Sequence, residues 1–559
     1  MAQTSIYQDQ KTSVKKRWER DEIASTILDY ESAKGERSQR QFAMENGVPR
    51  TTLQHWLSRK NNLECSPVVA AFFVSPDGLA WLHRMITAAH LEFGENSPAS
   101  IHNISRFFEL CGVGPFIATS YSTHYRISQR MDEAIIEFGV SEQKTLAETM
   151  PAKTIALCED ETFHPEICMV AIEPRANYIV LEKYVENREG KTWDSVVESA
   201  LEGLPVKVNQ VVSDEARGLI NHTTKGLKAH HSPDCFHVSH EIVKGTSGPL
   251  NGSIKKAEKR LETVAKETQQ QIQLKEQYDG QVKRPRGRRP HFEERIEAAV
   301  LVEKQASDDL EAAKHNREIV KEANREIGRC YHPYHPEKGE KQDSQKVADI
   351  LQSCFERINT AIIGLPDRCK KRVDKAHRVV KDMVANIAFF FLVINGYIEN
   401  MGLSDCERKL MNDYLIPGFY LQRVARTEKD ADRKGAISAR SKELLSILTA
   451  HDGPLAGYSE DEIDALKIAA EDCAHIFQRS SSCVEGRNAQ LSLRHHGIHR
   501  LSERHLKALT IVHNYHIRNR DGTTPAERFF EAKHKVLFEW LLDNMEYPAR
   551  PRRRLARAA

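Results

Sequence analysis

The spacing of hydrophobic residues changes twice along this chain. Up to about residue 150, and again from about 246, apolar residues recur every three or four positions, which is the period of amphipathic helices. Between residues 154 and 245 they instead form short runs rich in β-branched residues, which are typical of strands. The pattern therefore predicts a multidomain protein in which mostly helical parts surround one α/β region.

The α/β region reads as three strands, a helix, a strand, a helix and a last short strand. In order, these segments are TIALCE, ICMVAIE, YIVLEKYV, TWDSVVESALEGL, VNQVVSD, EARGLINHTTKGL and HHSPDCFHV. The first three predict an antiparallel meander because they follow one another closely. The order βββαβαβ is that of the RNase H-like fold, a mixed sheet in which the first and fourth strands are neighbours. We therefore expect Asp160, ending the first strand, to lie near Asp214, ending the fourth.

Residues 21–60 predict three short helices, with a tight turn, ENGV, between the last two. Ser38 suits the start of the second helix as its cap, and Gly47 suits its end because glycine adopts the left-handed conformation freely. This is the helix-turn-helix pattern, in which the third helix enters the major groove. The residues expected to contact bases or phosphates are Arg50, Thr51, Thr52, Gln54, His55, Arg59 and Lys60. The alternative is an ordinary helical hairpin of a larger core.

Residues 66–150 predict further amphipathic helices. Within them, RFFELCGVGPFIATSYSTHYRISQRM resembles a second, weaker helix-turn-helix, with Gly112 and Gly114 in the turn. A second DNA-binding domain and a simple helical linker domain both fit this pattern.

Residues 246–470 are almost wholly helical and interrupt the α/β region as a long insertion. Two charged segments, 253–280 and 292–328, have the spacing of a coiled-coil hairpin. The loop between them either grips DNA phosphates or is only solvated, and its basic residues are Lys283, Arg284, Arg286, Arg288 and Arg289. The most apolar window, AFFFLVI at 388–394, is far shorter than the ~20 residues of a membrane span and predicts a buried core helix.

A chain of 559 residues is too long for one core, and ~150 residues per domain predict several. We expect a helix-turn-helix domain at 1–65, a second helical domain at 66–150 and the first part of the RNase H-like core at 151–245. The insertion at 246–470, closing helices of the core at 471–535, and a C-terminal helix with a basic tail at 536–559 complete the chain.

Composition narrows the class of protein further. The net charge is only +2, so nucleic-acid binding must come from local basic patches. None of the eleven cysteines forms a CxxC pair, which argues against a zinc ribbon, and free thiols fit a reducing cytoplasm. Cys330, His332 and His335 lie close together, but the prolines between them favour a structured turn over a zinc site. The start of the chain is polar, without a secretory signal, and no GxxxxGK[ST] motif supports an ATP-driven mechanism.

Three acids carry the candidate chemistry: Asp160, Asp214 and Glu485. Carboxylates suit Mg²⁺ because this cation is hard and takes oxygen ligands. Each acid also has a simpler explanation when it is taken singly. Asp160 sits in EDE, where its neighbours could be surface charges, Asp214 could cap the next helix, and Glu485 could be an exposed helix residue. Together, in this strand order, they predict a metal site.

The motifs DETF, VVSDEARG, DCFHV, VEGRNAQLS and GTTPAERFF resemble those of DDE-type transposases of bacterial insertion sequences whose RNase H-like core carries a large helical insertion. The resemblance implies that Asp160, Asp214 and Glu485 bind two Mg²⁺ ions, with Mn²⁺ able to substitute. It also implies that Asp234 and His237 support the metal ligands or position DNA, and that Arg487 and Asn488 face a bound strand.

The same resemblance implies a bacterial, cytoplasmic and nucleoid-associated enzyme. It would bind the terminal inverted repeats and the target DNA as a homodimer or higher oligomer, with no membrane partner. The 271 residues between Asp214 and Glu485 are more than compact members of the class have, so Glu471, Asp472 and Glu503 are alternative third acids. A non-catalytic DNA-binding regulator, a decayed transposase that kept its fold and a helical scaffold protein are the alternative functions.

Overall fold

In the computed structural model, which describes residues 18–61, 65–163, 165–282, 287–449, 453–479, 481–497, 501–519 and 521–551, the apolar runs form one five-stranded sheet. Its strands are β1 (Lys153–Phe163), β2 (Ile167–Glu173), β3 (Tyr178–Val185), β4 (Val206–Ser213) and β5 (His230–Pro233). The order across the sheet is β3-β2-β1-β4-β5. The first three strands are antiparallel, as expected for a meander, whereas β4 runs parallel to β1 and β5 parallel to β4. The expectation that the first and fourth strands are neighbours is confirmed.

The sheet belongs to one of two compact units. One unit comprises residues 152–488, and the other comprises residues 1–151 together with 489–559. The helices that follow Asn488 therefore group with the N-terminal region. This differs from the expectation that residues 471–535 close the core around the sheet, because only the part up to Asn488 shares a unit with it.

Helices α8 (Gly190–Leu201) and α9 (Arg217–Asn221), with the π-helix η2 (His222–Gly226), connect the strands. Trp193 and Val197 of α8 are fully buried, and α8 packs against β3 and η2. Glu161 of β1 accepts a hydrogen bond from Trp193 Nε1 at 3.1 Å. Because side chains alternate along a strand, Asp160 must point to the opposite face of the sheet.

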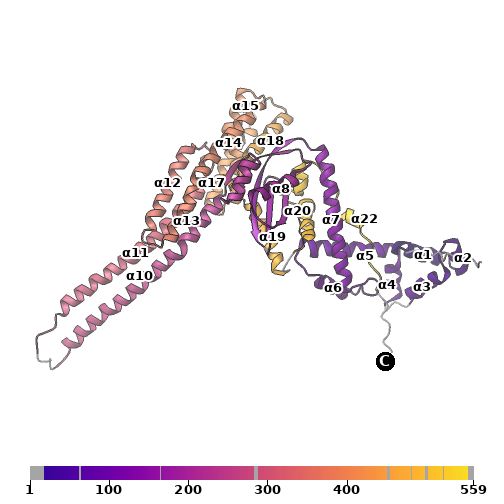
Figure 1. The fold of residues 1–559 in the computed structure, drawn as a ribbon, viewed down its shortest axis with the longest axis horizontal. Coiled ribbons are helices and arrows are strands. Elements are labelled where there is room, and N and C mark those ends of the chain that lie inside the picture. The colour runs from indigo at the N-terminus through magenta and orange to yellow at the C-terminus, as the bar shows by residue number, and fades with distance from the viewer. Residues whose placement is uncertain are drawn as a thin grey trace, which may run out of the picture. The chain divides into compact units, whose positions relative to one another are not determined.

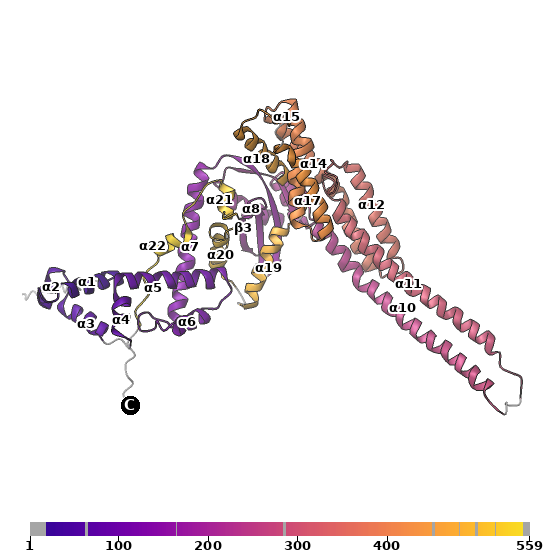
Figure 2. The same ribbon diagram turned by 180° about the vertical axis from the view of Figure 1, so that it is seen from behind.

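The insertion begins with two long helices, α10 (Cys235–Asp279) and α11 (Phe292–Cys330). They lie side by side and antiparallel, as both views show (Figure 1, Figure 2). A helical hairpin is therefore present where one was predicted, and α10 starts earlier than expected, directly after Asp234. The remaining helices of the insertion are α12 (Ser344–Ala361), α13 (Asp367–Arg378), α14 (Val380–Asn400), α15 (Asp405–Leu410), η3 (Met411–Leu415), α16 (Ile416–Thr427), α17 (Ala431–Leu445), η4 (Ser446–Leu448) and α18 (Glu460–Ile476).

Helix α14 is the core helix of the insertion and also its link to the sheet. The stretch Asp367–Asn400 is long and apolar enough to cross a membrane by length and composition, and 44% of its most apolar window is buried. Met383, Ile387 and Phe390 lie in one hydrophobic core with α12 and α16, as expected for AFFFLVI. On the same helix, the fully buried Asn386 accepts hydrogen bonds from Gln210 of β4 and Ser232 of β5, at 3.1 and 2.6 Å.

The other unit begins with α1 (Arg20–Ser32), α2 (Gln39–Glu45) and α3 (Arg50–Asn61), close to the three predicted helices. The Ser38 hydroxyl caps α2 by accepting from Gln41 N at 3.2 Å, and Gly47 has a φ of 63° in the turn before α3. Five residues of α2, α3 and the turn between them are buried against one another: Phe42, Ala43, Val48, Leu53 and Trp56.

The rest of this unit contains α4 (Pro67–Val74), α5 (Pro76–Ala89), η1 (His90–Asn96), α6 (Ile101–Leu110) and α7 (Tyr121–Thr149). After α19 (Ser482–Gly497), which crosses the boundary of the units, it adds α20 (Glu503–Tyr515), α21 (Pro525–Phe530) and α22 (Leu537–Asn544). The predicted second, weaker helix-turn-helix has a different form, because ten residues separate α6 from an α7 of 29 residues. Gly139 of α7 lets α20 approach closely, since a Cβ there would lie 2.6 Å from the Ile511 side chain.

We expect Asn386→Leu to lower the free energy of unfolding of the sheet-containing unit by roughly 2 kcal/mol. The change removes the partner of two buried side chains, and an unsatisfied buried polar group costs about 1–3 kcal/mol. Urea unfolding followed by circular dichroism measures the effect. Asn395→Leu, on the exposed side of the same helix, is the matched control. Equal unfolding midpoints for the two variants would contradict the role given to Asn386.

Candidate metal centre at the strand ends

Three aspartates lie in one register across the parallel part of the sheet: Asp160, Asp214 and Asp234. Cys158 of β1 pairs with Val212 of β4, and Val212 pairs with Ser232 of β5. Each aspartate comes two residues after its paired residue, so the three fall at the same level of the sheet. The carboxyl ends of parallel strands meet at one edge, which is where α/β sheets bind ligands.

Asp160 differs from its expected position in one respect. It lies inside β1, three residues before Phe163, and not at the end of the strand. The reason is that β1 remains paired with β2 as far as Phe163, whereas its pairing with β4 stops at Cys158. Asp214 does follow its strand, and its Oδ1 accepts a hydrogen bond from Ala216 N at 2.9 Å. It does not cap α9, because the N-cap residue of that helix is Ala216 and has no side-chain capping bond.

Asp234 connects two distant helix starts. Its Oδ1 accepts from Phe236 N at 2.7 Å and so caps α10. Its Oδ2 accepts from the backbone N–H of Ser481 at 3.0 Å and from the Ser481 hydroxyl. Ser481 in turn begins α19, because its carbonyl accepts from Val484 N and Glu485 N. The buried Asp234 carboxylate therefore holds the start of α19 beside the strand ends.

This contact brings Glu485, in the first turn of α19, to the site. One ligand atom each from Asp234, His237 and Glu485 lies within 4.8 Å of the others. Asp234 and His237, expected to have supporting roles, are thus direct neighbours of Glu485. The alternative acids lie elsewhere, since Glu471 and Asp472 are on α18, where Asp472 pairs with Arg175, and Glu503 begins α20 in the other unit.

Two residues of α19 contact the sheet. Asn488 donates from Nδ2 to Asp160 Oδ2 at 3.0 Å, which fixes the orientation of that carboxylate. Arg487 was expected to face a bound DNA strand, but it points to the sheet instead. Its side chain is only 7% exposed and makes two hydrogen bonds, of 2.8 and 2.7 Å, to the carboxylate of Glu182 on β3. Arg487 and Asn488 cannot both face the same surface, because neighbouring residues of a helix point about 100° apart.

The carboxylates of the site repel one another. The pKa of Asp160 is raised to about 6, mainly by burial and also by the charges of Asp214 and Asp234, while the Glu161 N–H and His237 oppose the rise. Burial likewise raises the pKa of Glu485, and the charges of Asp234 and Asp160 add to the effect. A bound cation would relieve this repulsion.

The donor set fits a hard divalent cation. Carboxylate oxygens are the ligands that Mg²⁺ and Mn²⁺ prefer, and an imidazole nitrogen is better tolerated by Mn²⁺. The buried Nε2 of His237 has no hydrogen-bond partner within 3.5 Å, and the nearest Asp234 oxygen is 3.9 Å away. Such an unsatisfied nitrogen next to two carboxylates is available as a ligand.

A pocket of about 450 Å³ opens beside the strand ends and was not anticipated from the sequence. Asp214, Asp234 and His237 line it together with Glu215 and Lys375. The pKa of Glu215 is raised to about 7 by burial and by the charges of Asp382 and Asp214, which Lys375 partly offsets. In the sequence, only its position after Asp214 could have drawn attention to Glu215. Lys375 offered no signal, since it lies on α13 of the insertion.

Buried ionisable groups also support the opposite face of β1. Glu159 and His222 are both fully buried, with 3.4 Å between Glu159 Oε1 and His222 Nε2, and His222 Nδ1 lies 2.7 Å from Asp194 Oδ1. Burial lowers the pKa of His222, but hydrogen bonds to Glu159 and Asp194 raise it above its ordinary value. These contacts lie beneath the strand segment that carries Asp160.

The residues expected to bind DNA differ in their exposure and in their contacts. On α3, Arg50, Thr51, Gln54 and His55 are exposed and Thr52 is half-buried. Arg59 donates to the carbonyl of Pro551, and Lys60 pairs with Glu31. At the tip of the α10–α11 hairpin, Arg288 is exposed and Arg289 pairs with Glu293 at 3.0 Å. Lys283, Arg284, Arg286 and tail residues 552–559 lie outside the described residues.

Two further polar clusters have structural explanations. His332 Nδ1 is 2.7 Å from the Tyr420 hydroxyl, Cys330 donates to a helix carbonyl, and His335 accepts from backbone N–H groups. These separate partners make the segment the structured turn that was favoured. Elsewhere, Glu95, Asp132 and His505 group closely, with His505 Nδ1 2.9 Å from Asp132 Oδ1 and 3.5 Å from Glu95 Oε2, as in a buried ion pair.

We expect Asp160→Asn to stabilise the metal-free protein near neutral pH. The Asp160 carboxyl keeps its proton up to about pH 6 in the folded protein, whereas its ordinary pKa is 3.8. The stability that the protonated carboxyl contributes is therefore complete below pH 3.8 and is lost as the pH rises through 6. Asparagine removes this loss and should raise the unfolding temperature by about 2–4 °C per kcal/mol gained.

We expect MnCl₂ to raise the unfolding temperature of the unmodified protein, and the same variant should lose this rise. Thermal unfolding with and without Mn²⁺, at about pH 5 and pH 7.5, measures both effects. Asp308→Asn, at an exposed position on α11, is the control for a generic change of charge. A full Mn²⁺ response in Asp160→Asn would rule out Asp160 as a ligand.

Comparison with known proteins leaves the activity open. Residues 411–557, a segment that includes Glu485, match a family described as a family of unknown function, DUF6399. No match to the chain is found among curated proteins. Over less than half of its length, the chain is thus similar to a family whose activity is not known.

Proposed function

We propose that the chain is a DDE-type transposase, a metal-dependent enzyme that cuts DNA at the ends of a mobile element and joins them to a target. The observation that carries the proposal is the row of Asp160, Asp214 and Asp234, with Glu485 held beside it by the contact between Asp234 and Ser481. Gathering these acids destabilises the protein unless a cation binds them, and DNA strand transfer is a reaction that uses such a site.

The sheet supports an RNase H-like core. Its order, β3-β2-β1-β4-β5, combines an antiparallel meander with two parallel strands, as that fold requires. The long helical insertion leaves the sheet after β5 and returns at α19, between the second and third acids of the proposed triad. The gap of 271 residues is therefore compatible with a shared site.

Asp160, Asp214 and Glu485 would hold two Mg²⁺ ions, for which Mn²⁺ could substitute, with Asp234 and His237 adjoining them. When bound, such ions lower the pKa of water and stabilise the attacking and leaving oxygens of a phosphodiester. Asn488 keeps the Asp160 carboxylate oriented, and the Ser481 contact keeps Asp234 in place. Lys375, on the wall of the pocket, is suited to contact a DNA phosphate that approaches the strand ends.

Recognition of DNA is assigned to the N-terminal helices. We propose that α2 and α3 act as a helix-turn-helix. Ser38 caps α2, the left-handed Gly47 lies in the turn between the two helices, and the front of α3 is exposed while its inner face is buried. The partners would be the terminal inverted repeats and the target DNA. Two element ends must be paired for transfer, so a homodimer or higher oligomer is the expected active form.

The test is metal-dependent cleavage of DNA. We expect the purified protein to nick a supercoiled plasmid that carries the DNA flanking its coding region, in the presence of Mg²⁺ or Mn²⁺. Asp160→Asn, Asp214→Asn and Glu485→Gln should each reduce the rate at least 100-fold, because each removes a ligand of the catalytic ions.

Glu471→Gln, an exposed acid on α18, is the matched control and should cleave at the normal rate. DNA binding, measured by fluorescence anisotropy, should stay within about threefold for all four variants, since the triad acts in chemistry. Binding without any metal-dependent cleavage would instead identify a DNA-binding regulator or a decayed enzyme. Cleavage that survives in Asp160→Asn and Asp214→Asn would overturn the proposed site.

A further inference from the structure

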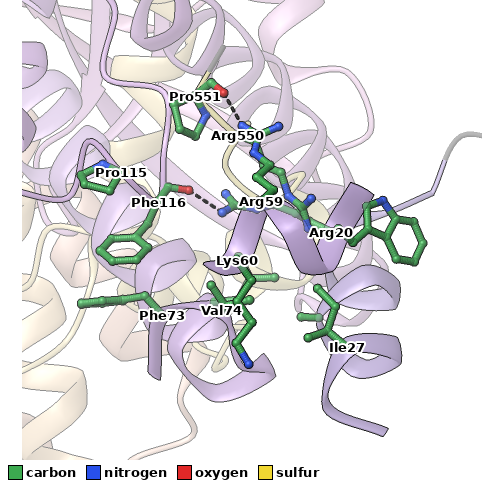
Figure 3. A pocket seen from close by; sticks show the side chains of 13 residues that line it. Arg20, Ile27, Arg59, Lys60, Phe73, Val74, Pro115, Phe116, Arg550 and Pro551 are labelled. Atoms are coloured by element: carbon green, nitrogen blue, oxygen red, sulfur yellow. Dashed lines mark hydrogen bonds between the residues drawn. The ribbon is translucent and has the colours of Figure 1, made fainter. Parts of the chain in front are cut away.

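A basic pocket lies in the unit formed by residues 1–151 and 489–559. Its space, which is open to solvent, is about 480 Å³. Four cationic residues line it, Arg20, Arg59, Lys60 and Arg550, of which Lys60 is paired with Glu31. Figure 3 shows the guanidinium groups of the three arginines gathered together, with Phe73, Pro115 and Phe116 to one side. None of the described residues that line the pocket is acidic. The site thus combines concentrated positive charge with an apolar wall.

The pocket is assembled from segments that are far apart in the sequence. Arg20 begins α1, and Arg59 and Lys60 end α3. Arg550 belongs to the C-terminal segment after α22, more than 500 residues from Arg20. Arg20 donates to the carbonyls of Pro548 and Phe116, and Arg59 donates to the carbonyl of Pro551. These bonds fix the C-terminal segment against the helices that were predicted to contact DNA.

Like charges are crowded in this pocket. The pKa of Arg20 is lowered to about 9, mainly by burial and also by the charges of Arg550 and Arg59. Burial also lowers the pKa of Arg550 to about 10, with Arg59 contributing. The carbonyl partners of Arg20 are neutral and do not cancel the charge. An anion that enters the pocket would be attracted by all the arginines at once.

We propose that this pocket binds a backbone phosphate of DNA, and that the C-terminal segment completes it by supplying Arg550. A phosphate fits because guanidinium groups bind its oxygens through paired hydrogen bonds. DNA is favoured over a free anion because Arg59 and Lys60 end the helix whose exposed face is proposed to enter the major groove. The inference deepens the proposed function and rests on the DNA binding assigned there.

The test compares Arg550→Gln with the unmodified protein for binding to a 30-base-pair duplex at several NaCl concentrations. Loss of one phosphate contact should reduce the slope of log K against log salt by about 0.9 and weaken binding roughly tenfold at about 0.1 M NaCl. The loss should be the same for duplexes of unrelated sequence. Arg550→Lys, which keeps the charge, should restore most of the slope.

Arg106→Gln, at an exposed position on α6 of the same unit, is the control for a generic loss of charge and should leave the slope unchanged. Thermal unfolding of each variant checks that Arg550→Gln stays folded, and Arg20→Gln provides a second probe of the pocket. Thermal shifts in sodium phosphate, at constant ionic strength, test whether the pocket binds free phosphate and not a phosphate of DNA.

An unchanged salt slope in a folded Arg550→Gln protein would overturn the proposal. Two other results would overturn DNA as the ligand. In one, Arg550→Gln abolishes a phosphate-dependent thermal shift but leaves the DNA affinity normal. In the other, the protein binds no DNA. A protein that binds DNA with the expected slope change but never cleaves it would refute the transposase function and leave the pocket supported.

Discussion

The candidate site depends on the contact between the Asp234 carboxylate and Ser481. One oxygen of the buried carboxylate caps α10, and the other accepts from the residue that begins α19. The two ends of the helical insertion are therefore closed onto the same side chain. Without this contact, Glu485 would have no fixed position relative to β1 and β4. Because the bond is buried, its loss would leave an uncompensated charge and would be strongly destabilising.

The insertion is a structural part of the sheet-containing unit. Asn386 of α14 binds side chains from β4 and β5, and the ring of Phe389 stacks on His230 at 4.1 Å. Lys375 of α13 lines the pocket beside the strand ends. The insertion thus packs against side chains of the β4–β5 part of the sheet. It also places Lys375, which pairs with Glu241 at 3.2 Å, on the wall of the pocket beside the carboxylates.

Local pattern was enough to predict much of the fold. The change from helical spacing to short runs rich in β-branched residues predicted the strands and their order, and the placement of β1 beside β4 follows from that order. Ser38, Gly47 and the apolar positions between residues 42 and 56 predicted the N-terminal helices, since capping and burial are short-range properties. The coiled-coil hairpin and the core helix at AFFFLVI were likewise evident from periodicity alone.

The sequence by itself determined that Asp160 and Asp214 belong to strands β1 and β4 or their ends, which helices are amphipathic and where the basic residues lie. Only the tertiary structure decided that Glu485, not Glu471 or Asp472, joins the aspartates, and that Arg487 points to Glu182 while Asn488 reaches Asp160. It also decided that Glu215 and Lys375 share a pocket, and that Arg550 meets Arg20 and Arg59. The physical reason is that a strand or helix is set by neighbours within a few residues. These contacts instead join segments that lie far apart in the sequence, by more than 500 residues for Arg20 and Arg550, and such a separation leaves no local signal.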